Sequence, residues 1–359
     1  MKSIQVSFSS RKSEYPIFIG NGILGNIAKL FNLGIYSKIV VVTDENVKKI
    51  LVKTISNYLP DNTYIITIPS GEKAKTIECT KKIWKELLRI GSDRKSLIIN
   101  IGGGVVLDLG GFAASTYMRG LDFLNIPTTL LAQVDASIGG KNGIDFSNIK
   151  NLIGTFSQPK GVVIDVQMLA TLPKREFLSG FAEVLKHGLI KDLNYFEKVT
   201  SIHPLELRKE ELVDIIKRSC EIKAEIVKID EKESGSRKLL NFGHTIGHAI
   251  EILLLETSAP LLHGEAISIG MLVEAKISHL MNLLSLSDLQ RIKQSLINAE
   301  LPISTTDIEI NKVLQKIKSD KKNEKGKVNF TLLQEIGKAV YNQIVPDEVI
   351  IQAMKYVTK

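Results

Sequence analysis

The apolar positions along the chain follow one pattern in its first half and another in its second half. Short, continuous runs of β-branched and other apolar residues recur in the first half, separated by longer stretches of helical character. Runs of this length suit strands that are buried on both faces of a parallel sheet. We therefore predict strands over residues 39–43, 64–68, 97–101 and 162–166, with helices over residues 45–58, 74–89 and 107–114.

After residue 172 the period of the apolar positions changes. Apolar residues recur there at spacings of three and four, as at Leu212, Ile215 and Ile216, which is the period of an amphipathic helix. The pattern predicts helices over residues 205–230, 239–256, 264–281 and 287–299, and a strand over residues 328–333. We therefore predict an α/β domain over residues 1–172, with a nucleotide-binding crevice at its strand ends, and a mainly α-helical domain over residues 173–359.

The charge of the chain limits its partners. The 359 residues carry a formal net charge of +8, which is compatible with nucleic acid, an anionic membrane surface or a small anionic substrate. The sequence has no arginine-rich stripe and no basic patch with interleaved aromatic residues, and its lysine pairs are scattered. A small anionic metabolite is therefore the favoured partner, and we expect neither nucleic acid nor a membrane.

Apolar runs and cysteines indicate a compartment. No apolar run approaches the ~18 residues that span a bilayer, and residues 1–10 alternate polar and apolar positions like a strand, unlike a signal peptide. The two cysteines, Cys79 and Cys220, have no CxxC neighbour and are expected to be reduced thiols. We therefore expect a cytoplasmic protein.

A glycine-rich turn, residues 102–108 (GGGVVLD), directly follows the third predicted strand and precedes a helix. Strand, glycine turn and helix is the arrangement in which backbone N–H groups approach a pyrophosphate. The alternative is a tight turn that needs positive φ. Asp44, at the end of the first predicted strand, is placed to accept a hydrogen bond from a ribose hydroxyl, but a lone Asp at such a position also serves as a helix N-cap.

Three of the six histidines lie within about twenty residues of one another. His244 and His248 are spaced i, i+4 in a helical stretch, so that both could bind one ion, or one could bind it while the other faces substrate. His263 begins the next helix, and Glu183 offers a carboxylate from an earlier one. A His/His/Glu set with an open position is typical of catalytic zinc, whereas helix-packing histidines are the alternative. Thr245 follows His244, so the H-E-x-x-H motif of a protease is absent.

Six longer motifs occur in order along the chain: VDASIGGKNGID, KNLIGTF, GFAEVLKHG, NFGHTIGHAIE, HGEAISIGM and DKKNEKGKVNFTLL. With them the chain resembles the 3-dehydroquinate synthase family of sugar phosphate cyclases over nearly its whole length. The resemblance implies a Rossmann-like NAD domain, a helical metal-binding domain, an active site in the cleft between them, and a homodimer. It also implies conversion of 3-deoxy-D-arabino-heptulosonate 7-phosphate to 3-dehydroquinate in the shikimate pathway, through transient oxidation, β-elimination, reduction, ring opening and aldol closure.

The resemblance also implies roles for individual residues. The metal ligands would be Glu183, His244 and His263, holding Zn²⁺ or Co²⁺. The catalytic residues would be His248, Lys186, Asn241 and Asp135. Substrate would be bound by Lys141, Asn151, Lys223, Arg237, one of Lys321 and Lys322, and Arg119 of the neighbouring subunit. NAD would be bound by Asp44, Asn46, Ser70, Gly71, Glu72, Lys73, Ala74, Lys75, Gly104, Val105, Val106, Leu107, Asp108, Thr128, Thr129, Lys141, Lys150, Met168, Leu169, Ala170 and Thr171.

The chain departs from the family pattern in two places. Leu107 replaces the usual glycine and is expected to place a side chain close to the cofactor, and Asn142 replaces a threonine before the unusual pair Ile144 and Asp145. Two rival enzymes share the domain plan: a cyclase whose substrate lacks the carboxylate, and a metal-dependent polyol dehydrogenase. Arg237 and Lys223, a natural carboxylate clamp, favour the dehydroquinate-forming enzyme over the first. A basic nucleic-acid-binding protein is the non-enzyme alternative.

Overall fold

The computed structural model describes residues 1–8, 11–54, 58–60, 63–147, 149–255, 257, 259–306, 308–319 and 328–358. Contacts divide the chain into two compact units. Unit 1 comprises Met1–Leu172 with Lys209–Ala224, and unit 2 comprises Pro173–Arg208 with Glu225–Lys359. The assignment of residues 1–172 and 173–359 to two domains stays a prediction.

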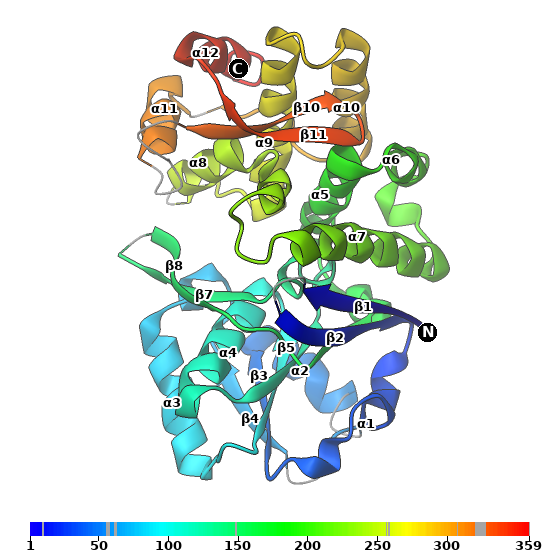
Figure 1. Cartoon of the computed structure of the whole chain (residues 1–359), viewed down its shortest axis with the longest axis vertical. Coiled ribbons are helices and arrows are strands. Elements are labelled where there is room, and N and C mark those ends of the chain that lie inside the picture. The colour runs from blue at the N-terminus through cyan, green and yellow to red at the C-terminus, as the bar shows by residue number, and fades with distance from the viewer. Residues whose placement is uncertain are drawn as a thin grey trace. The chain divides into compact units, whose positions relative to one another are not determined.

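Unit 1 is built on one seven-stranded sheet (Figure 1). Its order is β1-β2-β9-β6-β5-β3-β4, with β1 antiparallel to β2 and every other pair parallel. Numbered by themselves in chain order, the parallel strands from β3 onward have the doubly wound order 2-1-3-4-5, which reverses between β3 and β5. The strands are β1 (Lys2–Phe8), β2 (Arg11–Gly20), β3 (Ile39–Asp44), β4 (Tyr64–Ile68), β5 (Leu97–Gly102), β6 (Asp122–Pro127) and β9 (Gly161–Asp165).

Helices cover both faces of this sheet, because alternate residues of each strand point to opposite faces. Val40 and Val42 of β3 pack in one core with α3 (Ile77–Ile90) and α4 (Gly104–Thr116). Ile39 and Val41 pack in a second core with η1 (Ile23–Asn26) and α1 (Ile27–Leu30). The four predicted strands are confirmed, but β4 lies at the sheet edge, so Tyr64 and Ile65 are exposed.

A two-stranded hairpin, β7 (Lys141–Phe146) and β8 (Ile149–Phe156), packs against α4. It was not predicted, because its strands are rich in glycine and polar residues. Unit 1 also contains α2 (Glu45–Thr54), the 3-10 helix η7 (Val166–Thr171) and a π-helix over Ala132–Ala136. Helix α3 begins three residues later than predicted, because Thr76 forms its N-cap and accepts a hydrogen bond from the Cys79 amide.

Unit 2 is mainly helical and is centred on α9, which packs against α5, α8, α10, α12 and β10. The predicted helices are present with shifted starts: α7 follows a 3-10 turn that begins at Pro204, and α8 follows the 3-10 helix η9 (Ser236–Asn241). A second strand, β11, pairs with the predicted one. The elements are α5 (Lys174–Lys191), α6 (Leu193–Thr200), α8 (His244–Leu254), α9 (His263–Leu280), α10 (Leu286–Asn298), α11 (Ile310–Lys318), β10 (Asn329–Glu335), β11 (Lys338–Ile344) and α12 (Asp347–Met354), while α7 (Lys209–Ile229) belongs to both units.

Strand β11 was missed because none of its residues is fully buried and its sequence includes an asparagine with positive φ, Asn342. No helix in the described part of the chain is both long and apolar enough to cross a bilayer.

Candidate metal centre and nucleotide-binding edge

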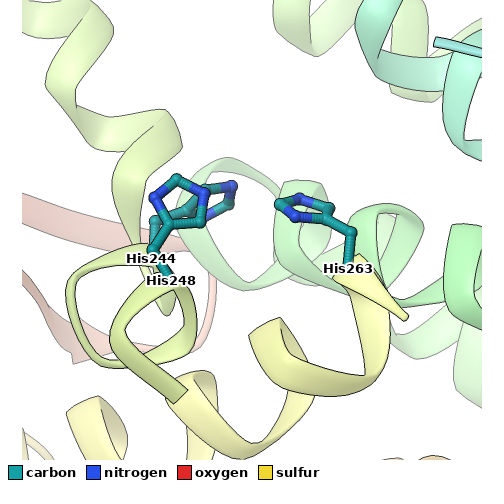
Figure 2. A group of neighbouring side chains, drawn as sticks. All are labelled: His244, His248 and His263. Carbon is teal, nitrogen blue, oxygen red and sulfur yellow. The ribbon is translucent and has the colours of Figure 1, made fainter. Parts of the chain in front are cut away.

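Three imidazoles of unit 2 face one another (Figure 2). His244 is the first residue of α8, His248 lies one turn later, and His263 is the first residue of α9. Their ring centroids are 5.0 to 5.6 Å apart, and they offer one nitrogen each within 4.8 Å of the others. Neutral imidazole nitrogens that lie this close together are potential ligands of a metal ion.

Glu183 of α5 lies against two of these rings. Its Oε1 is 3.7 Å from Nε2 of His244 and 3.9 Å from Nε2 of His263. Two ligand atoms on one tetrahedral zinc lie roughly 3.3 Å apart, given bond lengths of about 2.0–2.1 Å. The distances from Glu183 Oε1 to the two predicted histidine ligands, His244 and His263, therefore exceed the separation that zinc requires by only about half an ångström.

The Glu183 carboxylate is completely buried. Neither oxygen accepts a hydrogen bond of normal geometry from the described residues, although Lys186 Nζ forms an ion pair with Oε2. Buried carboxylate oxygens without donors are costly. A bound cation would satisfy Oε1, so the donor set fits a metal ion on an observation independent of the histidines.

Anchors on the far side of two rings fix which nitrogen is available. Nδ1 of His244 lies 3.1 Å from the carbonyl oxygen of Phe242, and Nδ1 of His263 lies 3.4 Å from Glu251 Oε2. A proton on each Nδ1 leaves the Nε2 lone pair free, and in both rings Nε2 faces Glu183. Burial, followed by the nearby charge of Lys186, holds the pKa of His244 well below its usual range, which keeps this ring neutral and able to bind a metal.

Two glycines on α9 allow the ligand-bearing helices to approach. A Cβ at Gly264 would lie 1.8 Å from the carbonyl oxygen of Ser179 on α5, and one at Gly270 would lie 2.0 Å from the carbonyl oxygen of Gly243. The Gly264 amide also donates to Ser179 Oγ at 3.0 Å. Because side chains at these positions would separate the helices, the glycines bring Glu183 and His244 next to His263.

Two buried carboxyl groups near this centre were missed from the sequence, Glu251 on α8 and Glu274 on α9. Each lies in an otherwise apolar helical stretch, AIEILL and GMLVEA. An acidic residue at a core position is itself a signal, since such groups are seldom fully buried without a partner.

The remaining candidates of unit 2 lie on the segment after α7. Asn241 Nδ2 donates to Glu233 Oε1 at 2.6 Å, and the buried Arg237 guanidinium donates to the carbonyl oxygen of Glu231. The Asp230 carboxylate accepts amide hydrogen bonds from Ser234, Gly235 and Arg237 at 2.7 to 3.0 Å, which fixes the turn that carries them. Lys321 and Lys322 lie outside the described residues.

The cofactor candidates of unit 1 lie at the carboxyl ends of the parallel strands, which we call the nucleotide edge. Asp44 is the last residue of β3. The segments that follow β4, β5, β6 and β9 contain, respectively, Ser70–Lys75, Gly104–Asp108, Thr128–Thr129 and Met168–Thr171. In doubly wound sheets, ligands bind at this edge where the strand order reverses, here between β3 and β5. Asp44 ends the first of these strands and the glycine turn begins at the end of the second, where Thr43 pairs with Ile101.

The glycine turn does not need left-handed backbone, because none of residues 102–104 has positive φ. Gly102 is required for space, since a Cβ there would lie 2.5 Å from Val106 Cγ2. Gly103, the N-cap of α4, has no side chain to cap the helix, so its first amides are suited to donate to an anion. Leu107 is buried, so its side chain packs inside the protein.

An ion pair connects two of the cofactor segments. Lys75 Nζ lies 2.5 Å from Asp108 Oδ2, and the lysine is almost fully buried. Burial opposes a charge on Lys75, but Asp108, together with the more distant Glu72 and Asp145, outweighs burial and raises the pKa of the ammonium. The amide of Asp145 on the hairpin donates to the Lys75 carbonyl at 2.8 Å.

Residues of the hairpin also contact one another and the neighbouring Glu72. Lys150 Nζ lies 3.8 Å from Glu72 Oε1, and the Asn151 amide donates to Asp145 Oδ1 at 2.8 Å. Asn142 is buried, and its Nδ2 donates to the carbonyl oxygens of Gly140 and Ser157, which explains how an amide fits where the family has threonine. Lys141 is exposed at the start of β7.

Asp44 does form the N-cap of a helix. Its Oδ1 accepts from the amides of Asn46 and Val47 at 2.8 and 3.0 Å and from Ser70 Oγ at 3.3 Å. None of these bonds uses Oδ2, so the cap leaves room for the ribose role as well.

Two further candidates of unit 1 pair with each other. Lys223 Nζ lies 2.6 Å from both the carbonyl oxygen and Oδ1 of Asp135, which belongs to the π-helix. Short π-helical turns are frequent at functional sites. Arg119 is exposed, in a left-handed conformation next to a second one at Met118.

Comparison with known proteins places these features in a family. Family models described as the N-terminal and C-terminal parts of 3-dehydroquinate synthase match residues 65–179 and 180–323. A 3-dehydroquinate synthase of Thermodesulfovibrio yellowstonii is 43% identical over 349 residues, covering 95% of this chain and 96% of its own.

Two solved structures are similar over almost the whole chain. A 2-deoxy-scyllo-inosose synthase complexed with carbaglucose-6-phosphate, NAD⁺ and Co²⁺ has a TM-score of 0.88 and 25% identity, covering 98% of this chain and 99% of its own. A 2-epi-5-epi-valiolone synthase of Streptomyces hygroscopicus subsp. jinggangensis 5008, with NAD⁺ and Zn²⁺ bound, has a TM-score of 0.87 and 26% identity, covering 96% and 97%.

A doubly wound α/β unit and a helical unit with a buried carboxylate–imidazole cluster thus define the fold of a sugar phosphate cyclase. Within that class, the chain belongs to the 3-dehydroquinate synthase family.

Proposed function

We propose that the chain is a carbon–oxygen lyase that converts 3-deoxy-D-arabino-heptulosonate 7-phosphate to 3-dehydroquinate and phosphate, in the shikimate pathway of aromatic amino acid biosynthesis. Membership of the family supports this activity. The single structural observation that carries it is the position of the buried Glu183 Oε1 between Nε2 of His244 and Nε2 of His263.

Glu183, His244 and His263 would hold the metal ion, and a fourth position would be left for substrate, as in catalytic zinc sites. Zinc and cobalt both suit this ligand set, and the two structural relatives hold one or the other. When bound, the ion would orient and acidify substrate hydroxyls, and the nicotinamide of NAD⁺ would accept and return a hydride.

His248 is the proposed proton carrier. Its ring lies beside both ligand imidazoles, with centroids 5.0 and 5.6 Å away, so a substrate at the ion would lie within its reach. Lys186, buried next to Glu183, and Asn241 are proposed to assist it. His248→Ala should therefore reduce turnover about 100-fold or more and leave zinc content unchanged. Full turnover in this variant would remove the assignment.

The charged ends of the substrate need cations. We propose that Arg237 and Lys223 bind its carboxylate, and that Lys141, Asn151, Arg119 and one of Lys321 and Lys322 bind its phosphate. Asp135 already holds Lys223 Nζ in a defined position and is proposed to act there with it.

NAD⁺ is proposed to lie along the carboxyl edge of the parallel sheet. The first amides of α4 suit the pyrophosphate, and Asp44 suits the ribose. Lys75, Asp108 and Lys150 shape the surrounding loops.

We also propose a homodimer in which Arg119 enters the neighbouring site. Arg119 is exposed, and each left-handed non-glycine residue in its turn costs on the order of 1 kcal/mol, which suggests a functional constraint. The hairpin exposes several large apolar side chains that a second copy would cover: Phe146, Ile149, Leu152, Ile153 and Phe156.

Mixing two inactive variants tests the dimer. If Arg119 acts across subunits, a mixed dimer of one Arg119→Ala chain and one His248→Ala chain has one complete site out of two. Random reassortment makes half of the dimers mixed, so the mixture should regain about a quarter of wild-type activity. No recovery after confirmed subunit exchange would contradict the arrangement.

A cytoplasmic location is proposed as well. Both cysteines are free thiols, as a reducing compartment maintains.

The activity itself is tested with the heptulosonate phosphate, NAD⁺ and Zn²⁺, with and without a chelator. Stoichiometric phosphate release and dehydroquinate formation, without net NADH, are expected and should cease with the chelator. Net accumulation of NADH would indicate a polyol dehydrogenase instead. Turnover of a hexose phosphate that lacks the carboxylate, in preference to the heptulosonate, would indicate a different cyclase.

A further inference from the structure

The N-terminus of α8 has an unusual cap. Its N-cap residue is Gly243, which has a left-handed conformation (φ 80°) and provides no side-chain acceptor. Serine, threonine, aspartate or asparagine normally supplies that acceptor. The first amides of α8 instead donate to the carboxylate of Glu274 on α9: Gly243 N lies 2.7 Å from Oε2, Ile246 N lies 3.2 Å from Oε1, and the Thr245 amide also donates.

His244 lies within the capped segment. It follows Gly243 directly and precedes the two other donors, and its own Nδ1 lies 3.1 Å from the Phe242 carbonyl. A rotation or fraying of this first turn would move His244 Nε2 away from Glu183 and displace His248, one turn further along. We propose that Glu274 is a positioning residue that fixes the first turn of α8 and thereby holds His244 and His248 in register with Glu183 and His263.

The chemistry of the position supports a carboxylate over its isosteres. Three N–H groups converge on two acceptor oxygens, whereas a glutamine would offer one acceptor and turn an NH₂ group toward another donor. Glu274 is completely buried and makes no ion pair with the described residues. Burial raises its pKa to about 8, whereas the three amide hydrogen bonds act in the opposite direction and favour the ionised form. Both the ionised and the protonated form therefore occur near neutral pH, and the acidic group is costly to the fold by itself.

The surrounding helices make the contact rigid. Gly270, on the same face of α9, approaches Gly243 so closely that a Cβ would lie 2.0 Å from its carbonyl oxygen. The first turn of α8 is therefore held by backbone contact with Gly270 and by the hydrogen bonds of its amides to the Glu274 carboxyl group. Removing the carboxylate leaves the amides without acceptors in a place that water cannot readily fill.

The test uses the full-length protein, with Zn²⁺ alone as ligand. Glu274→Gln keeps the volume of the side chain, and Glu274→Asp keeps the carboxyl group but shortens its reach. Zinc affinity is measured by competition with a chromophoric chelator, and the ligand field by the visible spectrum of the Co²⁺-loaded protein. We expect zinc affinity to fall about 10-fold or more in both variants, as for other outer groups that orient metal ligands, with altered Co²⁺ bands.

Asp165→Asn is the matched control. Asp165 in unit 1 is likewise buried and accepts from three amides, Gly22, Gln167 and Leu24, at 2.8 to 3.1 Å. Its variant should lose comparable stability with unchanged zinc affinity. The inference would be overturned if Glu274→Gln kept both the zinc affinity and the Co²⁺ spectrum of the wild type. If only Glu274→Asp folds, the same result in that variant would overturn it. An equal loss of zinc affinity in the control would overturn it as well.

The inference rests on the metal site of the proposed function. If the wild-type protein binds no zinc, the proposed function itself is contradicted. If the wild-type protein binds zinc and the Glu274 variants bind it equally well, only the positioning role is contradicted.

Discussion

The metal centre of unit 2 and the nucleotide edge of unit 1 are built from different parts of the chain. At the candidate metal centre, side chains from three helices converge, and the two histidine rings are each oriented by a further group, the Phe242 carbonyl for His244 and Glu251 for His263. At the nucleotide edge, the ends of five parallel strands and the first amides of α4 provide the surface, and side chains mainly shape the loops. Single substitutions should therefore have large effects at the first site and small effects at the second.

Glu183→Gln should have the largest effect. It removes the one carboxylate among the proposed ligands and leaves a neutral amide in a buried position. We expect zinc affinity to fall more than about 100-fold, beyond the range typical of outer groups, with loss of activity. Metal content after dialysis, measured by atomic emission, provides the check, and full zinc occupancy would mean that the ligand set is different.

Glu251→Gln should have an intermediate effect. The amide can no longer accept the Nδ1 proton of His263 as strongly, but all three ligands remain. Zinc affinity should fall about 10-fold, and less than in Glu183→Gln. Competition with a chelator, measured for both variants side by side, ranks their zinc affinities. A greater loss in Glu251→Gln than in Glu183→Gln would contradict the proposal that Glu183 binds the metal and Glu251 only orients His263.

Asp44→Asn should have the smallest effect and separates two roles of one residue. Asparagine caps helices about as well as aspartate, so the midpoint of thermal unfolding should be nearly unchanged. A weaker acceptor for the ribose should raise the KM for NAD⁺ a few-fold, in keeping with the ~1 kcal/mol of one hydrogen bond. An unchanged KM would leave Asp44 as a helix cap alone.

The same contrast explains what the sequence could predict. Strands β3, β5 and β9 are buried along their whole length, so their apolar runs identify them directly. Strand β6 was not predicted, because its buried interior includes Asn125, which pairs with Asn100 at 3.1 Å, and because it ends in a proline. Strand β8 is largely exposed, and no residue of β11 is fully buried, so neither has the continuous apolar run of a core strand.

The candidate site divides in the same way. Glu183, His244 and His263 could be named because the family motifs contain them, and the structure brings these three together. Glu251 and Glu274 could not be assigned, because their roles depend on contacts between helices that spacing along the chain does not reveal. The shifted starts of α3 and α8 have the same origin, since caps and 3-10 turns decide where those helices begin.

The convergence of one carboxylate and two imidazoles on a single ion is tested most directly by a crystal structure of the zinc-loaded protein with anomalous scattering at the zinc edge. We predict one peak bound by a Glu183 oxygen, His244 Nε2 and His263 Nε2 at about 2.0–2.2 Å, with His248 outside this set. A peak that takes His248 in place of Glu183, or one bound elsewhere in the protein, would contradict the account.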